Sequence, residues 1–158
     1  MNSLAEIQKV EDEYRRGVPA LGRALRLLIS RWQAGARDEK TALRLLFLLW
    51  YAVAEPPYLT GLDEVVGAPS FNSVFEQAGG EEGAGPLVLF ALSVMIDVYP
   101  NAVSDDENDE AALAERSKRL REKALRERPD LSAGLFAEQG GAAGDYFQHI
   151  MKGFERRT

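Results

Sequence analysis

Residues 45–54 read LLFLLWYAVA, and residues 87–96 read LVLFALSVMI. Neither stretch contains a charged residue, and each presents apolar side chains in every direction when it is wound as a helix. A helix that is apolar all round belongs in the centre of a globular core, and both stretches fall short of the roughly 20 residues that cross a bilayer. They therefore predict two buried central helices and no membrane span.

Helical signals extend outward from this pair in both directions. Apolar residues recur at three- and four-residue spacing, and capping or helix-breaking residues bound each run. A strand over residues 87–96 is disfavoured, because the run is long and no second β-branched run is present to pair with it. We expect helices over residues 3–16, 19–34, 38–54, 70–78, 87–99, 104–127 and 145–156, with connecting loops over 57–69, 79–83 and 140–144.

These elements predict an all-α fold. Residues 1–158 are expected to form a single-domain layered bundle of about seven helices, with the two apolar helices at its centre. The chain has no cysteine, which excludes a disulfide framework and a zinc site built on sulfur. Residues 1–14 lack the basic start and apolar run of a secretory signal, so we expect a cytoplasmic protein.

Charge is distributed unevenly along the chain, whose net charge is −6. Residues 55–115, hereafter the acidic segment, hold thirteen Asp and Glu and no Lys or Arg, whereas the sequences on either side carry net positive charge. Phosphate binding requires a dominant basic field, so nucleic acid is not an expected partner. A basic protein partner is expected instead, because complementary charge speeds association and adds specificity.

No catalytic or cofactor motif is present in the sequence. His149, the only histidine, points away from the apolar face of its helix and is predicted to face solvent. The acids that follow residue 104 lack the spacing of a calcium loop. The glycines of residues 140–144 match neither the dinucleotide-binding glycine motif nor the P-loop spacing. We therefore predict no catalytic residue, no metal and no cofactor, which favours a non-enzymatic protein.

Asp97 draws attention because it lies near the end of an apolar helix. A carboxylate in apolar surroundings is costly unless it is hydrogen-bonded or paired. Two interpretations are open: a structural contact with a loop backbone or an arginine of the second helix, or the polar floor of a pocket.

A second cluster of candidates consists of Trp50, Tyr51, Glu55 and Tyr58, at the end of the first central helix. Aromatic rings with polar tips are common at binding surfaces, and they also occur where a helix end closes a core. Both interpretations remain open.

Two functional hypotheses follow. The first is an inhibitor- or immunity-like interaction module that docks a basic partner, with candidate binding residues Asp105, Asp106, Glu107, Asp109 and Glu110. We expect these acids, and those near residues 81–82, to lack fixed ion-pair partners. The alternative is a small-molecule-binding protein or enzyme with Asp97 and Glu55 in a pocket between the third and fifth helices. The sequence does not distinguish a monomer from a homo-oligomer.

Overall fold

The computed structural model describes the chain except for residues 64, 66, 104–108 and 158, and the described residues form helices and connecting turns without strands. The all-α prediction is confirmed. The described residues form ten α-helices where about seven were expected, because α4, α6 and α9 are short helices in segments expected to be loops or turns. The elements are α1 (Leu4–Arg15), α2 (Leu21–Gln33), α3 (Glu39–Ala54), α4 (Pro57–Thr60), α5 (Phe71–Gln77), α6 (Gly80–Gly83), α7 (Pro86–Val98), the 3-10 turn η1 (Pro100–Ala102), α8 (Glu110–Glu127), α9 (Ala133–Ala137) and α10 (Gly141–Arg157).

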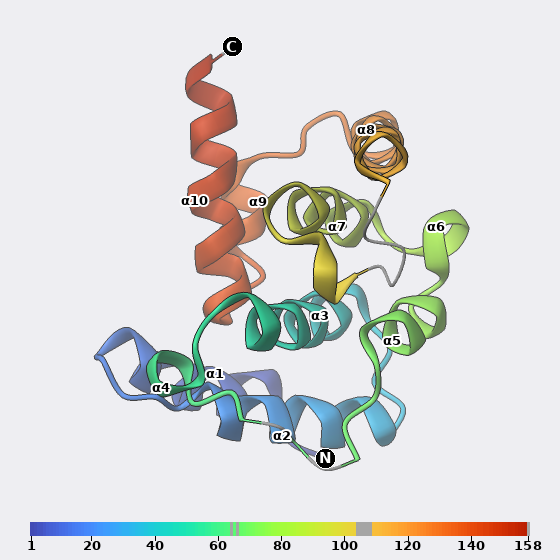
Figure 1. The fold of residues 1–158 in the computed structure, drawn as a ribbon. Coiled ribbons are helices and arrows are strands. Elements are labelled where there is room, and N and C mark those ends of the chain that lie inside the picture. Colours follow the sequence, from blue (N-terminus) through green and yellow to red (C-terminus); the bar gives the residue numbers. More distant parts are fainter. Residues whose placement is uncertain (64, 66, 104–108, 158) are drawn as a thin grey trace.

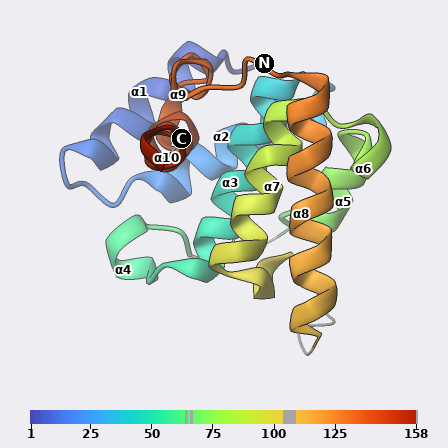
Figure 2. The same cartoon turned by 90° about the horizontal axis from the view of Figure 1, so that it is seen from above.

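The helices are arranged as a stack with one helix across its side. Helices α2, α3, α7 and α8 follow one another through the stack, each packed on the next (Figure 1). Helix α10 crosses the stack along one side, where it contacts α1, α3 and α9, while α5 and α6 lie on the opposite side (Figure 2). Among the described residues, no helix is long and apolar enough to span a membrane.

The core is centred on α3 and α7, as the two apolar stretches predict. Residues 41–48 and residues 87–96 are buried. The last turn of α3, however, reaches the surface, and the side chain of Val53 is 53% exposed. Residues 45–54 therefore lie in the core only over their first part, and the end of α3 is available to line a cavity.

Helix α7 begins without a capping side chain of its own. It starts after Gly85, and the carboxylate of Glu39 on α3 accepts a hydrogen bond from the backbone N–H of Leu87 at 3.2 Å. A Cβ atom at Gly85 would overlap that carboxylate, so only glycine leaves room for the cap. Burial raises the pKa of the Glu39 carboxyl, and the helix N–H groups offset only part of that rise.

Candidate ligand-binding site

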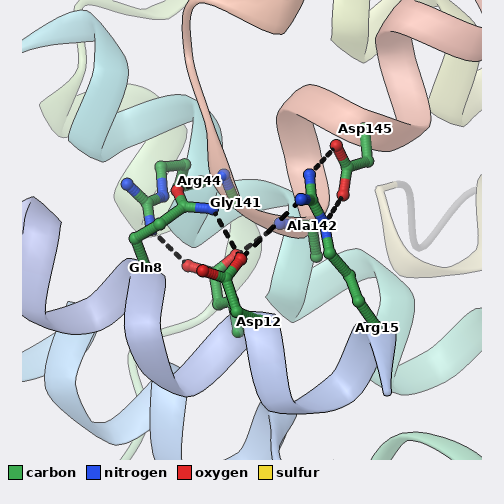
Figure 3. Close-up of polar contacts among 8 residues, drawn as sticks. Gln8, Asp12, Arg15, Arg44, Gly141, Ala142 and Asp145 are labelled. Carbon is green, nitrogen blue, oxygen red and sulfur yellow. Dashed lines mark hydrogen bonds and ion pairs between the residues drawn. The ribbon is translucent and has the colours of Figure 1, made fainter. Parts of the chain in front are cut away.

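Helix α10 begins inside the glycine-rich segment, so the loop expected over residues 140–144 is wrong. Gly140 and Gly141 have φ angles of +72° and +67°, which glycine adopts without strain. Side chains of α1 then cap the new helix, as Figure 3 shows for Gln8. Its Oε1 accepts from the N–H of Gly141 at 2.6 Å, and Glu11 Oε2 accepts from the N–H of Ala142.

Glu11 also forms a buried ion pair with Arg44 of α3. Both side chains are 2% exposed, and Arg44 Nη2 donates to Glu11 Oε1. The Nε atom of Arg44 is buried and has no hydrogen-bond partner in the part of the chain that the structure describes. A Cβ atom at Gly141 would lie 2.3 Å from Glu11 Oε2 and 2.8 Å from Arg44 Nε. The close approach of α10 to this pair therefore requires glycine at position 141.

A cavity of about 300 Å³ opens beside this pair, between α1, α3 and α10. Four of its nine lining residues are aromatic, and we name it the tyrosine cavity. Ring faces supply apolar surface, and the phenol hydroxyls supply a few polar atoms, a combination typical of small-molecule sites. The lining residues are Tyr14, Phe47, Tyr51, Tyr146, Glu11, Arg15, Ala142, Asp145 and His149.

Two phenols of the cavity, those of Tyr51 and Tyr146, have raised pKa values. The hydroxyls of Tyr14 and Tyr51 lie 3.3 Å apart, within hydrogen-bond distance. Burial raises the pKa of Tyr51, and the hydrogen bond to Tyr14 and the charge of Glu55 raise it further. Burial, and then the charge of Glu55, also raises the pKa of Tyr146. These hydroxyls therefore act as hydrogen-bonding groups, because ionisation to phenolate is disfavoured.

An ion pair forms the rim of the cavity. Arg15 of α1 donates from two guanidinium nitrogens to the carboxylate of Asp145 on α10 (Figure 3). Both side chains are about half exposed. The pair joins the same two helices as the Glu11 cap, and it neutralises the charge of Arg15 at the cavity mouth.

The predicted cluster at the end of α3 is only partly brought together at this site. Tyr51 lines the cavity, and Glu55 acts electrostatically on two of its phenols. Trp50 lies behind the wall, 1% exposed, with its indole N–H donating to the carbonyl of Tyr99 at 2.9 Å. Tyr58, on α4, is 79% exposed and lies outside the lining.

The expectation that Asp97 sits in apolar surroundings is wrong. Its side chain is 44% exposed at the end of α7, where the helix extends beyond the core. Its ion-pair partner is Arg121 of α8, not an arginine of the second helix. The guanidinium of Arg121 also lies over the ring of Phe154, 5.2 Å from its centroid. The structural interpretation of Asp97 thus has a partner, although a different one from that expected.

Asp97 also lines a second cavity, of about 330 Å³, between α7, α8 and α10. The linings of these two cavities do not join Asp97 to Glu55, and the pocket expected between the third and fifth helices stays a prediction. A smaller cavity of about 230 Å³ brings Asp97 together with Glu110, another predicted candidate, at the start of α8.

The acidic segment is more fully paired than we expected. Glu81 lies in α6, and it accepts hydrogen bonds from Arg116 and Arg119 of α8. Partial burial raises the pKa of Glu81, but these two arginines outweigh it and hold that pKa below its usual value. The expectation of a connector without fixed ion pairs near residues 81–82 is therefore wrong.

The remaining acidic candidates differ in what the structure says of them. Asp109 caps α8 by accepting from the N–H of Ala112, and Glu110 is exposed in the first turn. The candidates Asp105, Asp106 and Glu107 lie outside the described residues. Ser104, at which the helix was expected to begin, also lies outside them.

Several residues of the site were not identified from the sequence. His149 is exposed, as predicted, yet it lines both larger cavities. The buried pair had one local signal: Glu11 falls on the same helical face as Leu4 and Ile7, where an apolar residue is expected. Nothing local indicated that Arg44 would meet it.

Within the part of the chain that the structure describes, no three His, Asp or Glu side chains are grouped so as to hold a metal ion. Comparisons with protein-family models, with curated proteins and with solved structures gave no match.

Proposed function

We propose that this protein binds a small organic molecule in the tyrosine cavity without transforming it chemically. The observation that supports this most directly is the lining, in which aromatic rings form apolar walls around a volume of about 300 Å³. That volume is at the lower end of the range for small-molecule sites. The location differs from the pocket expected from the sequence, but a carboxylate, that of Glu11, is again part of the wall.

The state of the polar groups supports binding over catalysis. A general acid or base needs a proton-transfer atom within reach of the reacting group. Both carboxylate oxygens of Glu11 are engaged, one by Arg44 and the other by the N–H of Ala142. The phenols of Tyr51 and Tyr146 have raised pKa values, mainly through burial, so they are poor bases at neutral pH.

Filling the cavity tests this proposal. The half-buried side chain of Ala142 lines the cavity, so Ala142→Leu should occupy it, whereas Ala111→Leu places the same side chain on the exposed surface of α8. A panel of small aromatic and alkylammonium compounds would be screened by saturation-transfer NMR. We expect binding to the wild type and to Ala111→Leu, and its loss in Ala142→Leu when circular dichroism shows that variant folded. Binding that survives in a folded Ala142→Leu protein would contradict the proposal, as would a panel without binders.

Docking of a basic protein through the acidic segment is the second candidate. The observation in its favour is a set of exposed carboxylates outside the ion pairs of α8, at Glu76, Glu82, Asp109, Glu110 and Glu115. The test is a pull-down from native lysate at low and high salt, using wild type and a variant with Asn or Gln at Asp105, Asp106, Glu107, Asp109 and Glu110. Capture should weaken with salt and with neutralisation. A partner retained equally in all four conditions would count against this candidate.

We further propose a reducing compartment, the cytoplasm, as the location. Supporting this is the absence of cysteine, which leaves the fold with no need of an oxidising environment.

A further inference from the structure

The rings of the tyrosine cavity are set at an angle to one another. Tyr51 stacks on Phe47, with ring centroids 4.9 Å apart and planes 25° apart. Tyr146 stands at 61° to Tyr51, with centroids 6.3 Å apart. Both rings line the same cavity, and the electron-rich face of an aromatic ring attracts alkylated ammonium groups.

Negative charge lies beside these rings. Glu55 follows Tyr51 by four residues and caps the C-terminus of α3, so the two share one side of the helix. Its charge acts on the hydroxyls of both Tyr51 and Tyr146. Helix α3 has no basic residue in its last turn, which leaves the negative end of its dipole uncompensated there. Among the described residues, no Lys, Arg or His is ion-paired with Glu55.

The cations already present do not fill this role. Arg15 lines the cavity, but Asp145 at the rim holds its guanidinium through two nitrogens. Arg44 is buried against Glu11 and is not part of the lining. Arg15 and Arg44 are thus each matched by a carboxylate, whereas Glu55 has no ion-pair partner among the described residues.

We propose that the tyrosine cavity takes an organic cation, an ammonium group carrying methyl or other alkyl substituents, held against the rings of Tyr51 and Tyr146 and attracted by Glu55. This inference rests on the proposed function, since it names the ligand class of the same site. A bound anion is disfavoured in the cavity, because its negative charge would be removed from water and placed near the negative charge of Glu55. The same two effects disfavour the phenolate forms of Tyr51 and Tyr146.

The experiment compares choline with its neutral isostere, in which a quaternary carbon replaces the nitrogen. The two have nearly the same shape, so a difference in their affinity reports on charge. Binding would be measured by calorimetry and by ligand NMR on the full chain. We expect choline to bind roughly tenfold more tightly than the isostere, the size of a partly desolvated cation–π contact together with a nearby carboxylate.

Matched variants assign the effect to its residues. Glu55→Gln should weaken choline binding several-fold and leave the isostere unchanged, while Glu115→Gln, which removes an exposed acid of α8, should change neither. Tyr146→Phe keeps the ring and should retain choline, whereas Tyr146→Leu should lose it. Circular dichroism of each variant separates loss of binding from loss of fold. If Tyr146→Leu does not fold, Tyr146→Phe remains as the test, and its failure to bind choline would contradict the role of the ring.

Two outcomes would overturn the inference, and they are distinguishable. Equal affinity for choline and the isostere, or equal weakening by Glu55→Gln and Glu115→Gln, would show that the cavity does not select for positive charge, and the proposed function would stand. Absence of binding by both compounds, and by the wider panel above, would remove the proposed function together with the inference.

Discussion

Helix α7 begins directly after Gly85 and α10 begins at Gly141, and each takes its N-terminal cap from a carboxylate of another helix. At α7 the cap is Glu39, which is half-buried and has no ion-pair partner among the described residues. At α10 it is Glu11, which is fully buried and held by Arg44. The same backbone requirement is thus met by a cap near the surface in one case and by a buried charge pair in the other. The two should respond very differently to substitution, because uncompensated charge is far more costly in the interior.

The largest effect is expected at Arg44. Replacing it with Met leaves the Glu11 carboxylate buried without its counter-charge, which should cost about 3–5 kcal/mol of unfolding free energy. Urea denaturation of wild type and Arg44→Met measures this difference.

A double variant serves as the control for that measurement. Glu11→Gln removes the negative charge but keeps an oxygen that can accept from the N–H of Ala142. Combined with Arg44→Met, it should therefore be more stable than Arg44→Met alone. If the single variant loses less than about 1 kcal/mol, or the double variant is less stable still, the pair is not the buried charge described here.

The next effect is expected at the start of α10. Gly141→Ala forces alanine into a positive φ and pushes a methyl group against Glu11 and Arg44, which should cost about 1–3 kcal/mol or more. Gly153 lies in the same helix with open space around its Cβ position. Gly153→Ala should instead stabilise the protein by about 0.5–1 kcal/mol, through helix propensity. Thermal unfolding of the two variants should show shifts of opposite sign, and a shared direction would contradict the described start of α10.

The smallest effect is expected at the cap of α7. Glu39→Ala removes an acceptor from the N–H of Leu87 and should cost about 0.5–2 kcal/mol at neutral pH, the range for loss of a helix cap. Urea denaturation measures it, and a cost as large as that of Arg44→Met would remove the contrast between the two caps.

The pH dependence of stability sharpens the same contrast. Burial raises the pKa of Glu39 in the folded protein, so the folded state binds its proton more tightly than the unfolded state does. The stability that comes from this shift is present below the unfolded pKa of about 4.3 and is lost as pH rises through the folded pKa. As pH rises from the unfolded pKa of about 4.3 through the folded pKa, the wild type should therefore lose stability relative to Glu39→Gln. A difference that grows in the opposite direction would contradict the raised pKa.

The candidate site shows where prediction from the sequence stopped. Tyr51 and Glu55 were identified because they end an apolar helix with polar groups, which is a local pattern. Glu11 and Arg44 were not, because their meeting depends on how α1 packs against α3. Asp97 was misjudged for a related reason: whether the end of an apolar helix is buried depends on how far its neighbours extend.

What the sequence by itself determined is the set of central helices. Two uncharged stretches, at residues 45–54 and 87–96, are too apolar to lie mainly at the surface, and helical periodicity is a property of near neighbours in the chain. Only the tertiary structure decided how α10 begins and where the cavity lies. The cap of α10 joins Glu11 to Ala142, 131 residues apart, and the ion pair joins Glu11 to Arg44, 33 residues apart. Contacts over such separations depend on the packing of whole helices, and no local pattern of residues specifies them.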